Sequence, residues 1–424
     1  MISGHWLAIA VYDEDGQNVV ITEALSVVPW AVWLTWLFQV MPVFFLVGGY
    51  VNGLGWQSAV GRGEGYATWL AGRLRRLVVP VLPVLAVWTL IGLGVTGVIS
   101  FWTYWFYMGS NILRLASQFA LLPAWFLVVY IVVVLLVPLS QRAWRRSGMA
   151  SFWALAGAVA LVDLLALGAG WSLLSWLNYL FVWLAMHQLG YAWQAGGFGN
   201  PWRCLLWAAG GMAALIALVS LGPYPISMVS VRGEEISNSL PPRVTLLALG
   251  VFQSGLLLAV EGPARRLLAR GVVWTATVLI NGLIMTIFLW HVTALLVVTA
   301  LPVVTAIAMK TKVGFAFVPG TAAWWLTRPL WFAAIAIVLA PFVALFSRFE
   351  RIGRAGRGAV PPVWQQLLGC GLVCFGLATL TLRGLTTESW PGINLLALGL
   401  PFVGGALVWF GGASEGTSDG RPDD

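Results

Sequence analysis

Residues 122–138 read LPAWFLVVYIVVVLLVP, and this stretch decides the fold class of the chain. With its neighbours it forms an apolar run over residues 119–140 that holds no charged side chain. A helix needs about 20 predominantly apolar residues to cross the hydrocarbon core of a bilayer. The run is long enough to do so, and it therefore predicts a membrane-spanning helix.

The same pattern recurs along almost the whole chain. The composition is 60% hydrophobic and only 9% charged, with a mean hydropathy of +0.89, which is far too apolar for a water-soluble protein. We predict an all-α, polytopic transmembrane bundle of about 10–12 helices. Besides 119–140, the predicted spans are residues 31–54, 77–100, 150–168, 172–194, 203–222, 244–260, 274–302, 329–347, 365–382 and 393–411, preceded by a shorter apolar stretch at 2–11.

The basic residues predict an orientation. If the predicted spans alternate in direction, sixteen Lys and Arg residues fall on one side of the membrane and seven on the other. The positive-inside rule places the richer side in the cytoplasm. We therefore expect a multi-pass protein of the plasma (inner) membrane, with both termini of the full-length form cytoplasmic. Topology also explains the net charge of +8, so no nucleic-acid partner is expected.

Two stretches contain residues that could serve either packing or ligand binding. In QVMPVFFLVGGYVNGLGW (39–56), the adjacent glycines Gly48 and Gly49 would let a helix or a ligand approach the backbone closely, and tight helix packing is the favoured interpretation. In YATWLAGRLRRLVVP (66–80), Arg73 and Arg76 share one helix face and could hold a phosphate group. The alternative for the arginines is a simple topology anchor.

The order of several motifs resembles the integral membrane acyltransferase-3 family. The motifs are MPVFFLVGGY (41–50), RLRRLVVP (73–80), LPAWFLVVYIVVVLLVP (122–138) and IMTIFLWH (284–291). An actinobacterial branch is most similar, on the strength of QVMPVFFLVGGYVN (39–52), WLAMHQLGYAW (183–193) and GPYPISMVSVRGEEISNSLPP (222–242). Family members transfer acyl groups, usually from acyl-CoA, to hydroxyls of glycans, glycolipids or other products at or beyond the membrane.

The resemblance covers about residues 1–347, which we expect to form an acyltransferase-like helical domain. Residues 348–411 would add a basic cytoplasmic loop and two further transmembrane helices. Residues 412–424 would be a disordered cytoplasmic tail, given their polar composition.

The resemblance also implies roles for particular residues. The first helix of the family typically begins with a basic residue and ends with a catalytic histidine about ten residues later, and SGHW (3–6) resembles that ending. His5 would then be catalytic, and Arg73 and Arg76 would bind the donor phosphates. Most of the first helix would lie before Met1, so we expect either a start codon placed too late or a truncated chain, whose activity is open.

A histidine is physically suited to this chemistry. An alcohol becomes an effective nucleophile when a base removes its proton during attack, and the imidazole pKa lies close to neutral pH. In a helix that ends near Val11, His5 would lie about 9 Å from the outer end of the helix. An acceptor arriving from outside could then reach it.

The remaining polar residues within the spans are further candidates. His187 belongs to a polar and aromatic stripe with Trp183, Tyr191 and Gln194, and such groups usually face a bundle interior. His291 lies on an apolar face and is more often a core residue, although the LWH match favours a role. The other candidates are Asn178 and Asn281, which could bond across helices, and Asp163, expected to reach toward water at the outer end of its span.

The outer segment 222–242 is long for a loop of a helical bundle, and it carries Arg232 and Glu235 between prolines. Loops on rigid scaffolds often bind ligands. The segment is therefore either an acceptor-side lid or a constrained connector, and the residues alone leave both open.

Together these observations predict a membrane O-acyltransferase that uses cytoplasmic acyl-CoA as donor substrate and binds neither metal nor cofactor. Its partners would be acyl-CoA, a carbohydrate or lipid-linked acceptor and the bilayer. The oligomeric state is not indicated. A transporter or flippase is the rival, but the paired half-repeats common in transporters are not visible in the sequence. An inactive, truncated homologue is the third alternative.

Overall fold

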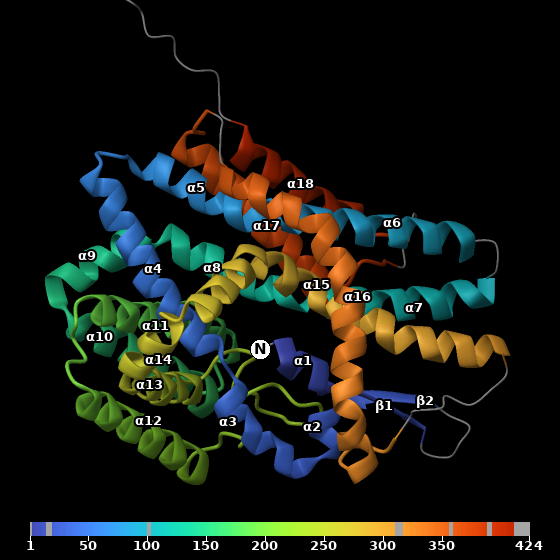
Figure 1. Ribbon diagram of the computed structural model, residues 1–424, viewed down its shortest axis with the longest axis horizontal. Coiled ribbons are helices and arrows are strands. Elements are labelled where there is room, and N and C mark those ends of the chain that lie inside the picture. Colours follow the sequence, from blue (N-terminus) through green and yellow to red (C-terminus); the bar gives the residue numbers. More distant parts are fainter. Residues whose placement is uncertain are drawn as a thin grey trace, which may run out of the picture. The chain divides into compact units, whose positions relative to one another are not determined.

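The computed structural model describes residues 2–13, 19–99, 103–309, 317–355, 359–387 and 392–410. These residues are helical apart from one two-stranded hairpin, the long loop between Leu221 and Val244, and shorter connections (Figure 1). The all-α prediction is therefore confirmed. The chain divides into two compact units. The first combines Met1–Ser58 with Val132–Phe342, and the second combines Ala59–Ile131 with Val343–Asp424.

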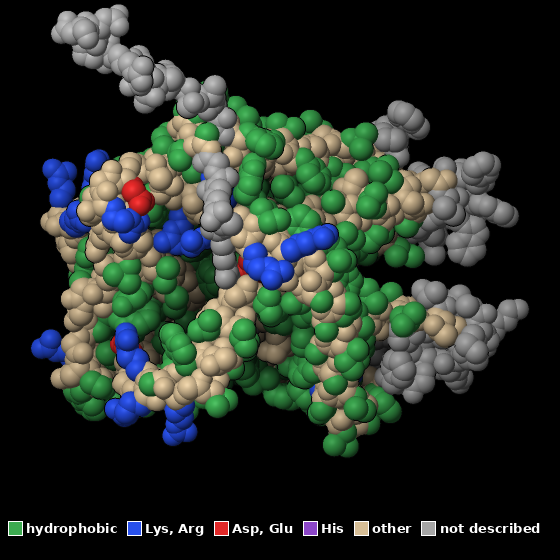
Figure 2. Space-filling model, turned by 45° about the horizontal axis from the view of Figure 1, so that its top comes forward, with side chains coloured by type: hydrophobic (Ala, Val, Ile, Leu, Met, Phe, Trp, Pro, Cys, Tyr) green, Lys and Arg blue, Asp and Glu red, His purple; other side chains and the backbone are tan. Residues whose placement is uncertain are grey.

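The described helices agree with the predicted spans. Seven are long and apolar enough to cross a membrane, and nine if each of two bent helix pairs forms one span. The helices α11 (Asn178–Gln194) and α18 (Leu395–Trp409) have 17 and 15 residues and are not among these seven or nine. Large apolar side chains such as Leu221 and Val272 are 88% and 86% exposed. On the face shown in Figure 2 hydrophobic side chains predominate, as expected for a lipid-facing surface.

The first unit begins with α1 and a β-hairpin and continues through the long helices. Its elements are α1 (Ile2–Ala8), β1 (Ile9–Asp13), β2 (Val19–Glu23), α2 (Ala24–Val27), a 3₁₀ segment (Pro29–Leu34), α3 (Thr35–Phe38), α4 (Met41–Gly61, up to Ser58), the end of α8 (Leu122–Leu135), α9 (Val137–Ser147), α10 (Met149–Asp163) with a π-helical extension (Leu164–Gly168), a second 3₁₀ segment (Ser172–Leu177), α11, α12 (Pro201–Leu221), α13 (Val244–Ala259), α14 (Glu261–Leu268), α15 (Gly271–Met309) and α16 (Ala322–Ala355, up to Phe342).

The first helix is shorter than predicted. The expectation that it continues to Val11 is wrong, because the chain leaves the helix after Ala8 and enters β1. This strand pairs antiparallel with β2, with Ile9 opposite Glu23 and Asp13 opposite Val19. β-Branched residues favour strands, and the pairing gives the backbone the hydrogen bonds that a helix would otherwise supply. His5 consequently lies three residues before the end of α1.

Close packing of α4 against α11 fixes the middle of the first unit. A side chain at Gly49 would collide with the backbone of His187, and one at Gly190 would collide with the backbone of Leu46 and Tyr50. Small residues allow membrane helices to approach this closely. The packing interpretation of Gly49 is thus confirmed.

The second unit joins the middle of the chain to its end. It contains α5 (Tyr66–Val78), α6 (Val81–Ile99), α7 (Thr103–Ala120), most of α8, the end of α16, α17 (Val363–Arg383) and α18. α17 packs closely on α18, where Gly369 lies opposite the backbone of Gly404. Ala59–Ile131 thus packs into one compact unit with Val343–Asp424, the part of the chain that contains the C-terminal helices.

Candidate active site: a histidine pair

Two of the three histidines meet in the first unit. His5 of α1 and His291 of α15 approach each other with 2.8 Å between Nδ1 of His5 and Nε2 of His291. Their rings are stacked, with centroids 5.1 Å apart and an interplanar angle of 11°. His291 is fully buried, whereas His5 is partly exposed. The pair therefore has one enclosed member and one member that a substrate could reach.

A backbone carbonyl determines which nitrogens carry protons. Nδ1 of His291 lies 2.6 Å from the carbonyl oxygen of Phe288, which can only accept a hydrogen bond. In the neutral ring, Nε2 of His291 must then be the acceptor, so Nδ1 of His5 donates to it. This leaves Nε2 of His5 with its lone pair and no proton. That atom is the one that could act as a base.

Tryptophan side chains connect the pair to α16. The indole nitrogen of Trp6 donates to the carbonyl oxygen of His291 at 3.3 Å. The indole nitrogen of Trp331 in turn donates to the carbonyl oxygen of Trp6 at 3.0 Å. Trp6 also packs against Phe332, with ring centroids 5.8 Å apart. These two hydrogen bonds therefore link α1, α15 and α16 through backbone carbonyls at or next to the paired histidines.

Arg328 on α16 lies beside Trp331, the tryptophan that bonds to the backbone of Trp6, and it was not among the residues predicted from the sequence. It is only 8% exposed, and its Nε donates to the carbonyl oxygen of Trp324. Its guanidinium lies over the rings of Trp324 and Trp331, at 4.4 and 5.1 Å from their centroids. A signal was available, because the two tryptophans flank Arg328 at spacings of four and three residues and hence on one helix face.

His187 has a different environment. It is fully buried on α11, with Nε2 3.3 Å from Nδ2 of Asn52, and it stacks on Tyr191. The hydroxyl of Tyr191 lies 2.9 Å from that of Ser140 on α9. The polar stripe therefore faces the helices packed against α11. It ties α4, α9 and α11 together through the partners of His187, Tyr191 and Gln194, the last of which donates to the side-chain oxygen of Gln57 on α4.

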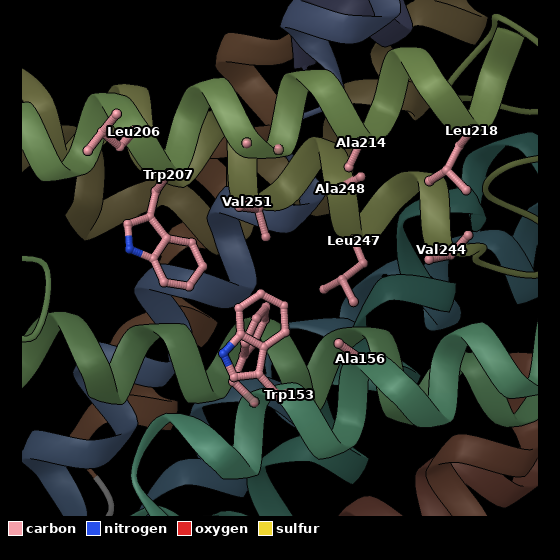
Figure 3. A pocket seen from close by; sticks show the side chains of 13 residues that line it. Trp153, Ala156, Leu206, Trp207, Ala214, Leu218, Val244, Leu247, Ala248 and Val251 are labelled. Atoms are coloured by element: carbon pink, nitrogen blue, oxygen red, sulfur yellow. The ribbon is translucent and has the colours of Figure 1, made fainter.

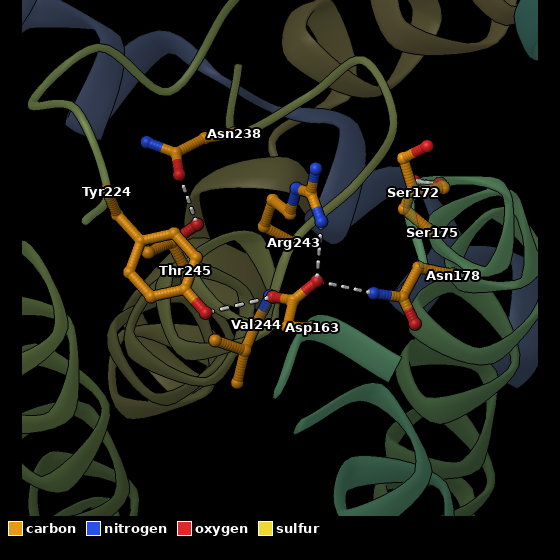
Figure 4. A network of polar contacts seen from close by, with 9 residues as sticks. All are labelled: Asp163, Ser172, Ser175, Asn178, Tyr224, Asn238, Arg243, Val244 and Thr245. Atoms are coloured by element: carbon orange, nitrogen blue, oxygen red, sulfur yellow. Dashed lines mark hydrogen bonds and ion pairs between the residues drawn. The ribbon is translucent and has the colours of Figure 1, made fainter. Parts of the chain in front are cut away.

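Asp163 is the centre of a buried network (Figure 4). Its carboxylate accepts hydrogen bonds from Nδ2 of Asn178, the hydroxyl of Tyr224, a guanidinium nitrogen of Arg243 and the backbone N–H of Val244. The expectation that Asp163 reaches toward water is wrong, because the residue is 1% exposed. The predicted cross-helix bond of Asn178 is confirmed. The acid is buried because four donors replace its hydration.

This network holds together the two ends of the long loop between α12 and α13. Asp163 holds residues at both ends of the loop, Tyr224 and Arg243, and burial beside the carboxylate raises the pKa of the Tyr224 phenol. Inside the loop, Nδ2 of Asn238 donates to the carbonyl oxygens of Pro225 and Ser227. The geometry favours the constrained connector over a lid.

The exposed part of the loop carries the remaining acceptor-side candidates. Arg232 and Glu235 are both exposed, and the backbone N–H of Arg232 donates to the Glu23 carboxylate at the end of β2. Asn281 is exposed on α15 rather than inside the bundle. The described residues contain no group of three His, Cys, Asp or Glu that could hold a metal ion.

The donor-site candidates belong to the second unit. Arg76 is exposed, and Arg73 is partly buried with its guanidinium 5.7 Å from the centre of the Trp69 ring. Arg75 between them has a structural role. It is 3% exposed and donates to the carbonyl oxygens of Ala359 and Trp409. Arg73 and Arg76 are thus the two members of the cluster whose charges a ligand could use.

These observations define the protein as a helical membrane protein with a pair of histidines in contact. The model of the acyltransferase-3 family, described as an acyltransferase domain, matches residues 1–348. The match covers most of the chain, so the protein belongs to this membrane acyltransferase family. No curated protein and no solved structure matches the chain.

Proposed function

We propose that the protein is an O-acyltransferase that moves an acyl group from acyl-CoA to a hydroxyl of a glycan, glycolipid or related cell-envelope acceptor. His5 is the general base, and His291 positions it. Arg73 and Arg76 bind the phosphates of the donor. Family membership supports acyl transfer in general and does not favour a transporter.

The hydrogen-bonded chain from Phe288 through His291 to His5 carries this proposal. It leaves the free lone pair on Nε2 of the accessible ring, which is what a general base requires. A protonated His5 would keep its bond to His291 as a charge-assisted one, so the pair stabilises the cation that forms during catalysis.

The reaction follows from these roles. Nε2 of His5 takes the proton of the acceptor hydroxyl as the oxygen attacks the thioester carbon. The tetrahedral intermediate collapses, the carbon–sulfur bond breaks, and the thiolate of CoA receives the proton from His5. The products are an ester and free CoA thiol, and the histidine returns to its initial state.

Substitution of His5 tests the proposal. His5→Ala in the full chain should reduce acyl transfer about 10²–10⁴-fold, which is the usual contribution of a general base. The measurement is transfer from radiolabelled acetyl-CoA to a total envelope glycolipid extract, in membranes matched for protein level. His187→Ala is the control, because that ring packs between helices, and its rate per folded molecule should remain near wild type. A His5→Ala enzyme with most of the wild-type rate would refute the role of His5.

A further inference from the structure

An apolar groove runs along the first unit between α10, α12 and α13 (Figure 3). Its volume is about 490 Å³. Buried residues form its floor, among them Phe152, Gly211 and Leu247, whereas Trp153 and Leu206 at its mouth are 58% and 56% exposed. The groove is therefore open on one side along much of α12.

The depth of the groove in the membrane restricts its occupant. Its walls belong to Met149–Gly168, Pro201–Leu221 and Val244–Ala259, which are all apolar enough to lie in a bilayer. The thirteen residues that line it carry no charged side chain, and their only polar side-chain atoms are the indole nitrogens of Trp153 and Trp207. A ligand at this depth must come from the hydrocarbon phase, which contains acyl chains.

One end of the groove has the features of a membrane interface. Trp153 and Trp207 stack there, with ring centroids 5.8 Å apart, and tryptophan favours the headgroup level. Arg203 precedes Trp207 by four residues and so lies on the same helix face, about one turn nearer the start of α12. Its side chain lies over Gly199.

Two further cations lie beside the start of α10. Arg145 and Arg146 are exposed in the last turn of α9, and α10 begins at Met149. Within the described part of the chain, neither they nor Arg203 forms an ion pair with an acidic side chain. Guanidinium groups bind phosphate strongly, so this end of the groove is complementary to an anionic headgroup.

We propose that this groove is a binding site for one anionic phospholipid. An acyl chain lies between α10 and α12, and the lipid phosphate contacts Arg203 together with Arg145 or Arg146. The site uses none of the residues placed in acyl transfer. It can therefore be tested whether or not the proposed reaction is correct.

Glycines with different surroundings provide a matched pair of variants. A side chain at Gly210 would project into the groove, and its Cβ would meet no atom within 4 Å. Gly157 on α10 is also helical and exposed, with nothing within 4 Å of an added Cβ, but it does not line the groove. Gly210→Leu should fill the groove without disturbing the helix packing. Gly157→Leu should leave both the groove and the packing unchanged.

The experiment is native mass spectrometry of the purified full chain with dipalmitoyl phosphatidylglycerol, and with dipalmitoyl phosphatidylcholine for comparison. The wild type should retain one phosphatidylglycerol and lose phosphatidylcholine at lower activation energy. Arg203→Gln should weaken retention about tenfold, since hydrogen bonds to charged groups are the stronger class. Gly210→Leu should abolish retention, and Gly157→Leu should match the wild type.

Other outcomes would overturn the proposal. If the wild type retained both lipids equally, the bound lipid would be non-specific annular lipid. The same would follow if Gly210→Leu retained phosphatidylglycerol as well as the wild type does. Retention of glycerophosphoglycerol, which has the headgroup without acyl chains, at the same level would show that the groove is not used. If Gly210→Leu does not insert, Ala214→Phe on the same wall should give the same loss.

Discussion

The three histidines show how much the immediate surroundings of a residue determine what it can do. His187 and His291 are both fully buried, but His187 contacts Asn52 and Tyr191 between packed helices. His291 instead faces a second histidine, and the Phe288 carbonyl determines its tautomer. Only the pair leaves a basic nitrogen on a ring that is partly exposed.

A pair of substitutions at His291 tests its positioning role. His291→Leu removes the acceptor for Nδ1–H of His5, so kcat should fall by about tenfold or more, within the contribution of a general base. His291→Gln keeps an oxygen acceptor and should retain a larger part of the rate. KM for acyl-CoA should not change in either variant.

The comparison of the two variants separates positioning from stability. If both lose activity equally while inserted protein falls in parallel, His291 has only a packing role. A wild-type kcat in His291→Leu would contradict positioning directly.

The arginines of α5 offer a second test at this scale. Arg73→Ala combined with Arg76→Ala should raise KM for acyl-CoA at least about tenfold, because charge-assisted contacts to phosphate are lost. Initial rates at varied acyl-CoA, in membranes with matched protein, measure the effect. Arg62→Ala is the control, since this exposed side chain pairs with Glu64. An unchanged KM would return both arginines to the role of topology anchors.

At the scale of elements, one carboxylate determines how α10, α11, α13 and the long loop are held. Asp163→Ala would leave Arg243 buried without its acidic partner, and breaking a buried pair in this way costs about 3–5 kcal/mol. We therefore expect a clear loss of thermal stability in detergent, together with faster proteolysis of the 222–242 loop. Glu64→Gln removes an acid from the exposed pair with Arg62 and should leave the melting temperature unchanged. Equal melting temperatures for all three proteins would contradict the anchoring role.

The sequence predicted helices better than it predicted their contacts. Each predicted span falls on helical segments, because about 20 consecutive apolar residues are a local signal, although spans such as 31–54 and 119–140 run across breaks between helices. The end of α1 was misplaced, since Ile9–Asp13 is apolar enough for a helix but pairs with a strand that starts ten residues after Ile9. The partnerships of His5 with His291 and of Asp163 with Arg243 span 286 and 80 residues, and no local pattern encodes them.

At the scale of the whole molecule, the helices beyond the family match are part of a compact unit rather than a separate addition. The match ends at residue 348, yet α17 and α18 pack with α5, α6 and α7. Arg75 is buried because the carbonyl oxygens of Ala359 and Trp409 accept its hydrogen bonds. The C-terminal helices therefore complete the surroundings of a residue that lies between the proposed donor arginines.

Orientation is a property of the whole chain, and it too can be tested. The sixteen-to-seven distribution of basic residues predicts that both termini of the full-length form are cytoplasmic. Alkaline phosphatase fused after Asp424 should be inactive, because that enzyme needs an oxidising compartment to form its disulfides. Green fluorescent protein at the same position should fluoresce. The opposite pair of results would invert the predicted topology.

The hydrogen-bond donors around Asp163 become available in a fixed order as the chain is synthesised. The ribosome makes the chain from the N-terminus, so α10 is complete before most partners of its acid exist. Asn178 follows 15 residues later, whereas Tyr224, Arg243 and Val244 follow after 61, 80 and 81 residues. At about 5–20 residues per second, the interval before Arg243 is roughly 4–16 s. During translation, the neutral amide of Asn178 is thus the first of these four donors available to the carboxyl group, and the Arg243 cation is made only after the 222–242 loop.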